Sequence, residues 1–345
     1  MKNTLSNNKS RFVSILVTLA AILSPIAVHA QDSYLLASVN GNTQNFGGAV
    51  FQYTPPGAQT TFAPGLSRPR RLAIYKGDLY VVTNTSDPVT GNFQSSILKV
   101  TASGVQTLFA TLSTVNSAAE GLAIDRAGNV FVVAFDQNSP ALASTIFKFT
   151  PDGAESTFGS LPGQSFGLAF DAAGNLFAAD ASDQTIFKFT PAGASSVFVG
   201  PAAFTGVQLP VGLAFDWSGN LLVTTEGNEG GPGGDAILVF APDGTESTFA
   251  TDLADPRGIA FDPSGDLLVA ELKELPAPGD ILKFSTNGSQ TVFASGIRQP
   301  QGNGGPEFPS VPQWPDAITS CFTQAGEPRQ HYACVRAMRV VVAKF

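Results

Sequence analysis

The chain has 345 residues and a formal net charge of −8, with 27 Asp and Glu against 19 Lys and Arg. An acidic chain lacks the basic surface that nucleic acid requires, so we expect no nucleic-acid partner. Only 13% of the residues are charged, whereas the chain holds 35 Gly and 24 Pro, a composition that favours many short strands joined by tight turns.

Residues 1–30 are predicted to form a secretory signal peptide. Basic residues precede an apolar run from Phe12 to Val28, and Ala30 is the small residue expected at a cleavage site. An uncleaved membrane anchor is the other interpretation, but the run is short for a bilayer span and contains Pro25. No later segment is apolar for long enough to cross a bilayer, so we expect a periplasmic or extracellular protein with no membrane span after cleavage.

Residues 31–302 repeat one pattern of about 14 residues. GLAIDRAGNVFVVA begins at Gly121, and close copies begin at Gly167, Gly212 and Gly258, at spacings of 46, 45 and 46 residues. A weaker copy, RLAIYKGDLYVVTN, begins at Arg71. A fixed period of this length indicates one supersecondary unit repeated in tandem, each unit covering the apolar surface of its neighbour.

Each unit reads as four short strands. GLAFD and LFAAD are apolar strands joined by a turn whose Gly can adopt a positive φ, and TIFKF is a third strand, apolar on both faces. The outermost strands end near six phenylalanines: Phe62, Phe109, Phe158, Phe198, Phe249 and Phe293. Because the chain enters the repeat at YLLASVN, which matches the second strand, we predict an all-β, six-bladed β-propeller of four-stranded antiparallel blades whose sixth blade is split between the N-terminal strands and a poorly matching C-terminus.

The repeat pattern stops after Gly302, and residues 303–345 form an irregular tail. Two interpretations remain open: a loose extension in which Cys321 and Cys334 pair or stay reduced, and an end replaced by a frameshift or rearrangement. We expect the split blade to lack a normal innermost strand unless residues 339–345 fill the place. Residues 31–302 contain neither Cys nor His, which excludes a Ser/His/Asp triad, a thiolate nucleophile or a common zinc site there.

The sequence GLAFDxxGNLxVAD, followed by IxKFTPDG and a closing TF, resembles the NHL-repeat and gluconolactonase-like (regucalcin-like) six-bladed propellers from Tyr34 to about Gly302. The resemblance implies the fold; this repeat occurs in sensors, binding modules and enzymes. In metal-dependent lactonases of this architecture, acidic and amide residues just before the innermost strands hold the catalytic ion. The aligned positions here are Arg70, Glu120, Phe166, Val211, Arg257 and Gln301. Only Glu120 is a carboxylate and no Pro follows Gly121, so the lactonase site is poorly matched.

The tight turns are expected on one face of the ring and the irregular second-to-third loops on the other, where we place the ligand site. The predicted ligand-binding residues are Arg70, Glu120, Arg257 and Gln301. The two arginines lie in the blades that flank the split blade. Each one either donates a bidentate pair of hydrogen bonds to a ligand carboxylate or forms an ion pair with nearby acids.

Three carboxylates at the ends of second strands, Asp180, Glu226 and Glu271, have two interpretations. They accept backbone N–H groups of the loops, or they bind Ca²⁺ or another divalent cation. We predict a monomeric binding or interaction module for a small polar ligand, carbohydrate or peptide, with no cofactor required and no catalytic residue assigned. The alternative is a metal-dependent lactone hydrolase.

Overall fold

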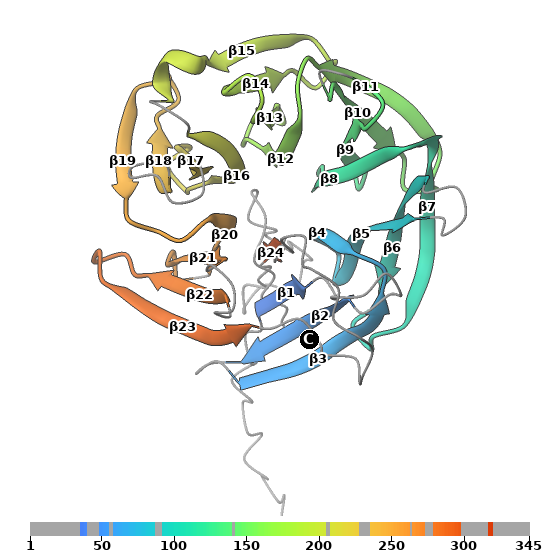
Figure 1. Ribbon diagram of the computed structural model, residues 1–345, viewed down its shortest axis with the longest axis horizontal. Helices are drawn as coiled ribbons and strands as arrows, with labels where there is room; N and C mark the ends of the chain where they lie inside the picture. Colours follow the sequence, from blue (N-terminus) through green and yellow to red (C-terminus); the bar gives the residue numbers. More distant parts are fainter. Residues whose placement is uncertain are drawn as a thin grey trace, which may run out of the picture. The chain divides into compact units, whose positions relative to one another are not determined.

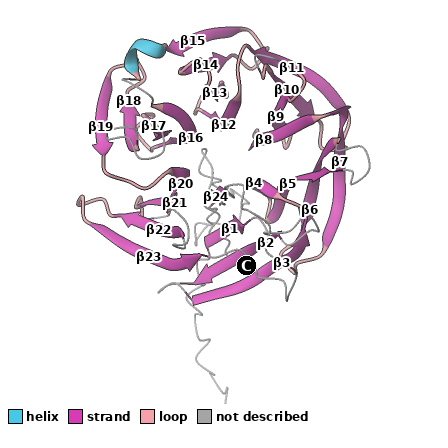
Figure 2. Cartoon of the chain, viewed as in Figure 1, coloured by secondary structure: helices cyan, strands magenta, loops and turns pink. Residues whose placement is uncertain are grey.

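A computed structural model describes residues 35–39, 48–54, 58–86, 92–139, 142–204, 208–227, 235–262, 264–272, 279–297 and 317–319. The chain divides into two compact units, Met1–Gln31 and Asp32–Phe345, and all described residues belong to the second. Within this unit, six four-stranded antiparallel sheets form a ring, so the protein is a six-bladed β-propeller (Figure 1). The elements described are strands apart from one short 3-10 helix at Pro201–Ala203 (Figure 2).

Five blades are continuous in sequence, and each runs from its innermost to its outermost strand in chain order. The first two comprise β4 (Pro69–Tyr75), β5 (Asp78–Ser86), β6 (Phe93–Val100) and β7 (Gln106–Val115), then β8 (Ser117–Ile124), β9 (Val130–Asp136), β10 (Ser144–Phe149) and β11 (Glu155–Leu161). The other three comprise β12 (Ser165–Phe170), β13 (Leu176–Asp180), β14 (Thr185–Phe189) and β15 (Ser195–Val199), then β16 (Leu209–Phe215), β17 (Leu221–Glu226), β18 (Ala236–Phe240) and β19 (Glu246–Ala250), then β20 (Pro256–Phe261), β21 (Leu267–Glu271), β22 (Gly279–Phe284) and β23 (Gln290–Ile297).

The remaining blade joins the two ends of the repeat region. It contains β1 (Leu35–Val39), β2 (Gly48–Thr54) and β3 (Ala58–Leu66), with β24 (Ala317–Thr319) as its innermost strand. β24 has three residues, against six to eight in the other innermost strands, and pairs with β1 through Ile318 opposite Ala37 and Ala317 opposite Ser38. The expected place of the innermost strand is therefore occupied, but by a short segment; residues 339–345, the predicted candidate, lie outside the described residues.

The recurrent D-x-x-G-N sequence builds the turn between first and second strands. Oδ1 of Asp125 accepts the backbone N–H groups of Ala127 and Asn129, and Oδ2 accepts the Asn129 side-chain amide at 2.7 Å. Gly128 has φ +89°, which a residue with a Cβ adopts only with strain. The Gly at this turn was correctly predicted to take a positive φ.

Aromatic contacts join neighbouring blades. The ring of Phe131 in β9 packs edge-on against Phe158 in β11 and against Phe170 in the next blade, at centroid distances of 4.9 and 5.1 Å. Phe177 in β13 makes the equivalent contacts with Phe198 and Phe215. Such pairs each contribute about 0.5–1.5 kcal/mol beyond the area they bury. No helix in the described part of the chain is long and apolar enough to span a membrane.

Candidate functional site

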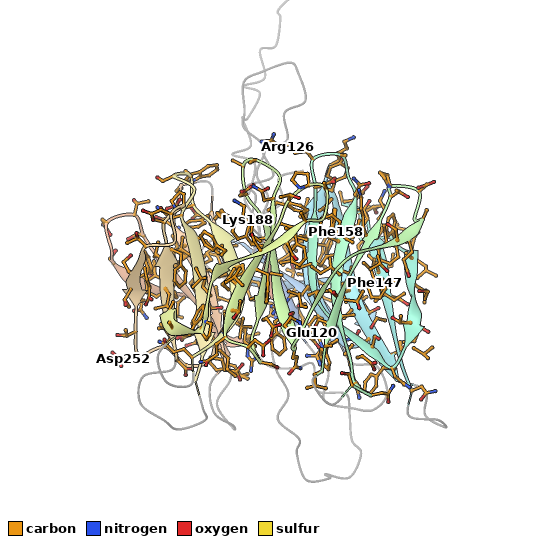
Figure 3. All side chains as sticks on the ribbon, turned by 90° about the horizontal axis from the view of Figure 1, so that it is seen from above. Glu120, Arg126, Phe147, Phe158, Lys188 and Asp252 are labelled. Atoms are coloured by element: carbon orange, nitrogen blue, oxygen red, sulfur yellow. The ribbon has the colours of Figure 1, made fainter. Side chains whose placement is uncertain are left out.

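The strand order places the two kinds of connection on opposite faces of the ring. Each innermost strand ends at a tight turn and starts from the connection that follows the preceding outermost strand. Figure 3 shows the consequence: Arg126, in a tight turn, lies at one edge of the ring, and Glu120 and Asp252 lie toward the other. We call the second edge the loop-rich face. The starts of the innermost strands therefore lie at the loop-rich face, where a ligand site was predicted.

Each continuous blade has a β-bulge at this end of its innermost strand. In β8, Glu120 is an extra residue between Ala119, which pairs with Ala134, and Gly121, which pairs with Val133. The other extra residues are Val211 in β16, Arg257 in β20, one of Arg70 and Arg71 in β4, and one of Phe166 and Gly167 in β12. Bulges redirect side chains and recur beside functional sites. The aligned position chosen from the sequence is thus a repeated structural feature.

The glycine that follows the bulge is required by the next blade. A Cβ at Gly121 would lie 2.6 Å from the carbonyl oxygen of Phe166, and one at Gly212 would lie 2.5 Å from the carbonyl oxygen of Arg257. Both distances are shorter than any tolerated contact. The backbone of one innermost strand therefore packs directly against the bulge carbonyl of the next, and this close approach explains why the repeated pattern begins with Gly.

Arg71 occupies this glycine position in the β4–β7 blade. Its Nε donates a hydrogen bond of 2.7 Å to the carbonyl oxygen of Glu120, the bulge carbonyl of the next blade, and the residue is 3% exposed. Where the other blades make a van der Waals contact, this blade makes a hydrogen bond from a guanidinium. Arg71 was not among the predicted site residues, although its signal was visible as RLAIY in place of GLAFD.

Arg70 and Glu120 meet across the same pair of blades. Nε of Arg70 lies 3.4 Å from Oε1 of Glu120, with 20% of the Arg70 side chain and 8% of the Glu120 side chain exposed. A third arginine, Arg68, stacks on the ring of Phe93 at 5.3 Å, and burial together with the positive charge of Arg70 lowers its pKa. Three guanidinium groups thus come from residues 68–71, and the two predicted residues Arg70 and Glu120 are brought together.

Arg257 is held between two carboxylates. Its Nη2 donates to Oε1 of Glu226 at 2.7 Å, and its Nε lies 2.7 Å from Oδ1 of Asp255. Only 9% of the Arg257 side chain is exposed. This is the ion-pair interpretation left open by the sequence, and it also accounts for Glu226, one of the three predicted metal ligands.

Asp180 and Glu271 both accept backbone N–H groups. Oδ2 of Asp180 accepts from Gly163 at 2.9 Å and Oδ1 accepts from Asp183 at 3.2 Å, while Oε1 of Glu271 accepts from Ala254 at 2.9 Å. Burial raises the pKa of Asp180 to about 6, and its backbone hydrogen bonds lower the value in part. These contacts stabilise loops at the loop-rich face.

The divalent-cation site at Asp180, Glu226 and Glu271 stays a prediction. Within the described ranges, no group of three or more His, Cys, Asp or Glu side chains is placed to hold a metal ion. Gln301, the fourth predicted ligand-binding residue, lies outside the described residues, as do Cys321, Cys334 and His331.

Comparison with known proteins identifies the architecture. No family model matches the chain, and no curated protein is significantly similar to it in sequence. Among solved structures, virginiamycin B lyase from Staphylococcus aureus is similar at 17% identity and TM-score 0.54, over 78% of this chain and 86% of that one. Regucalcin, a calcium-binding protein from Agrobacterium tumefaciens, is similar at 14% identity and TM-score 0.53, over 71% and 87%. A protein proposed to be a gluconolactonase is similar at 14% identity and TM-score 0.51, over 90% and 100%.

These similarities establish the fold and not the activity. The likeness to gluconolactonase-like and regucalcin-like propellers that the sequence predicted is confirmed at the level of architecture, and lyases share it. The NHL-repeat resemblance stays a prediction. Function must therefore be argued from the residues at the loop-rich face.

Proposed function

We propose that this protein is a binding module that takes a small anionic ligand, of the sugar-acid or hydroxycarboxylate class, at the loop-rich face between β4 and β8. The observation that carries the proposal is the meeting of Arg70 and Glu120. They come from bulges of adjacent innermost strands, their charged groups lie 3.4 Å apart, and a fifth of the Arg70 side chain is exposed.

The two side chains offer complementary chemistry. A guanidinium presents five N–H donors in a planar fork that matches a carboxylate. An ionised carboxylate only accepts, so Glu120 suits a ligand hydroxyl. A ligand with a carboxylate beside a hydroxyl satisfies both residues at once, as uronic and aldonic acids do.

Arg257 takes a structural role in this proposal. A ligand carboxylate would have to displace Glu226 or Asp255, both within 2.7 Å of its guanidinium. Arg70 has a longer ion pair and a more exposed side chain, so binding a ligand there disturbs less. Of the two arginines predicted from the sequence as ligand-binding residues, the proposal therefore keeps only Arg70, together with Glu120. We further propose that the protein acts as a monomer in the periplasm or outside the cell, in keeping with the signal peptide predicted at residues 1–30.

The test is calorimetric titration with D-galacturonate and D-gluconate, using neutral D-galactose as the comparison ligand. We expect the acids to bind wild-type protein and galactose not to bind. Losing a hydrogen bond to a charged group costs about 1.5–3 kcal/mol, so Arg70→Ala should weaken binding about ten- to a hundredfold. Arg126→Ala removes an exposed arginine on the opposite face and should leave affinity unchanged.

Equal losses in Arg70→Ala and Arg126→Ala would contradict the proposed location, and absence of binding to both acids would contradict the ligand class. A lactone-hydrolysis assay with and without a chelator tests the alternative, a metal-dependent lactonase. Chelator-sensitive turnover would replace the binding-module assignment.

A further inference from the structure

The start of β8 is held by buried side chains of the preceding blade. Nδ2 of Asn84, in β5, donates to the carbonyl oxygen of Ala119 at 3.1 Å, and the Ala119 N–H lies 3.3 Å from Asn84 Oδ1. The same N–H lies 3.1 Å from Oγ of Ser95, in β6. Ser95 Oγ in turn lies 2.7 Å from Asn84 Oδ1 and 2.8 Å from the carbonyl oxygen of Ser117.

Arg71 extends this set of contacts by one residue. It donates to the carbonyl oxygen of Glu120, so Arg71, Asn84 and Ser95 together hold the backbone of residues 117–120. The three residues are 3%, 1% and 0% exposed. In this dry environment each hydrogen bond orients its partner strongly, and an unsatisfied group would be costly.

The other four continuous blades have different residues at the positions of Arg71 and Asn84. The positions aligned with Arg71 are Gly121, Gly167, Gly212 and Gly258, and those aligned with Asn84 are Phe135, Ala181, Glu226 and Leu272. Glycine stands at this position in all four, and Gly121, Gly167 and Gly212 each pack against the bulge carbonyl of the next blade. Burying a guanidinium there instead carries a desolvation cost that packing does not require. Residues that depart from a repeated sequence pattern at such a cost in free energy are found mainly at functional sites.

We infer that Arg71 and Asn84 are positioning residues that fix the bulge at Glu120 and so aim its carboxylate at the ligand hydroxyl. This inference rests on the proposed function, because it assigns Glu120 as a ligand contact. Arg71 and Asn84 act through the backbone of Ala119 and Glu120 rather than by touching the ligand. The chain itself supplies matched variants, since its other blades show which residues the fold accepts at these positions.

The decisive variant is Arg71→Gly, which restores the glycine found in the other blades. We expect it to fold and to bind D-galacturonate about tenfold more weakly than wild type. The reason is that Glu120 loses the hydrogen bond that orients its backbone. Arg71→Lys, which keeps a cationic donor, should recover part of that loss. In a Glu120→Gln background, Arg71→Gly should have little further effect, because residues that act through one another are not additive.

Hydrogen–deuterium exchange of residues 117–120 gives a readout that needs no ligand. Arg71→Gly and Asn84→Ala should both accelerate exchange there, and exchange of residues 163–166, the equivalent segment at the start of β12, should not change. Unchanged exchange at 117–120, wild-type affinity in Arg71→Gly, or additive losses with Glu120→Gln would overturn the inference. If wild-type protein binds no acid but exchange accelerates as expected, the proposed function fails and the positioning of the bulge stands.

Discussion

Arg70 and Arg257 occupy the same repeat position on the two sides of the split blade, yet their surroundings differ. Nε of Arg70 lies 3.4 Å from a carboxylate oxygen of Glu120, and 20% of the Arg70 side chain is exposed. Arg257 has two carboxylates at 2.7 Å, and 9% of its side chain is exposed. The bulge therefore determines where an arginine is placed, and the neighbouring acids determine whether it stabilises a loop or remains accessible to a ligand.

The origin of the acidic partners explains the difference. Glu226 ends β17 of the preceding blade and Asp255 lies two residues before Arg257, so that arginine ties a blade connection to its neighbour. The partner of Arg70 is Glu120, which is itself a bulge residue of the next innermost strand. Arg257 thus ties together two connections between strands. Arg70 instead forms a pair with Glu120 at the loop-rich face.

The largest effect is expected from Arg257→Ala. Removing this guanidinium leaves Glu226 and Asp255, each with a side chain 19% exposed, without their cation. Breaking a largely buried pair costs about 3 kcal/mol or more. Urea unfolding should show that loss, and Arg257→Lys should recover only part of it because lysine cannot bridge both acids with a planar fork. A loss below about 1 kcal/mol would place Arg257 with Arg70 as a weakly coupled arginine.

The next effect concerns Asp180, which shares its repeat position with Thr83 and Glu271. Its folded-state pKa of about 6 lies above the ordinary value of 3.8, so the folded state binds more protons between these pH values. Stability from this group is fully present below about pH 4 and is lost as pH rises through about 6. Relative to Asp180→Asn, wild-type protein should lose about 2 kcal/mol between pH 4.5 and 7. A pH-independent difference in unfolding free energy would show that Asp180 has an ordinary pKa.

Gly212→Ala tests the close approach of neighbouring strands. The added Cβ would meet the carbonyl oxygen of Arg257 and Oγ1 of Thr224, each at 2.5 Å. Overpacking of this kind costs about 1–3 kcal/mol. Arg71→Gly introduces a glycine at the equivalent position and should reduce stability by less. Thermal unfolding of the two variants measures the difference. Equal losses would mean that the glycine position is not a packing constraint.

Most of the architecture was predictable because the repeated sequence pattern indicates the strands and turns of each blade. The six outermost strands contain the six phenylalanines that the sequence indicated, and the Gly of the first-to-second turns has a positive φ. The closing strand β24 could not be predicted, because Ala317–Thr319 carries no repeat sequence and pairs with β1 at the far end of the chain. Contacts of such sequence separation leave no local periodicity.

The positions of the candidate residues in the fold were predictable from the sequence, but their contacts were not. Aligning the repeats identified Arg70, Glu120 and Arg257, because the bulge recurs at the same place in each innermost strand. Arg71 was missed because the glycines at its position were included in the first strand without a role of their own, and the carbonyl that they face belongs to the next blade. The pairing of Arg257 with Glu226 depends on the angle between two blades, which no single repeat encodes.

The smallest effect on stability is expected from Arg70→Ala, the variant that should matter most for binding. Nε of Arg70 lies 3.4 Å from Oε1 of Glu120, against 2.7 Å for both carboxylate contacts of Arg257, so we expect this longer ion pair to contribute less, about 1 kcal/mol. Arg71 also stays hydrogen-bonded to the backbone carbonyl oxygen of Glu120, so the bulge keeps this contact with the preceding blade. Urea unfolding should therefore place Arg70→Ala within about 1 kcal/mol of wild type, and raising the salt concentration should reduce the difference further. If Arg70→Ala destabilised the protein as much as Arg257→Ala, both arginines would be structural, and the ligand site proposed between β4 and β8 would lose its support.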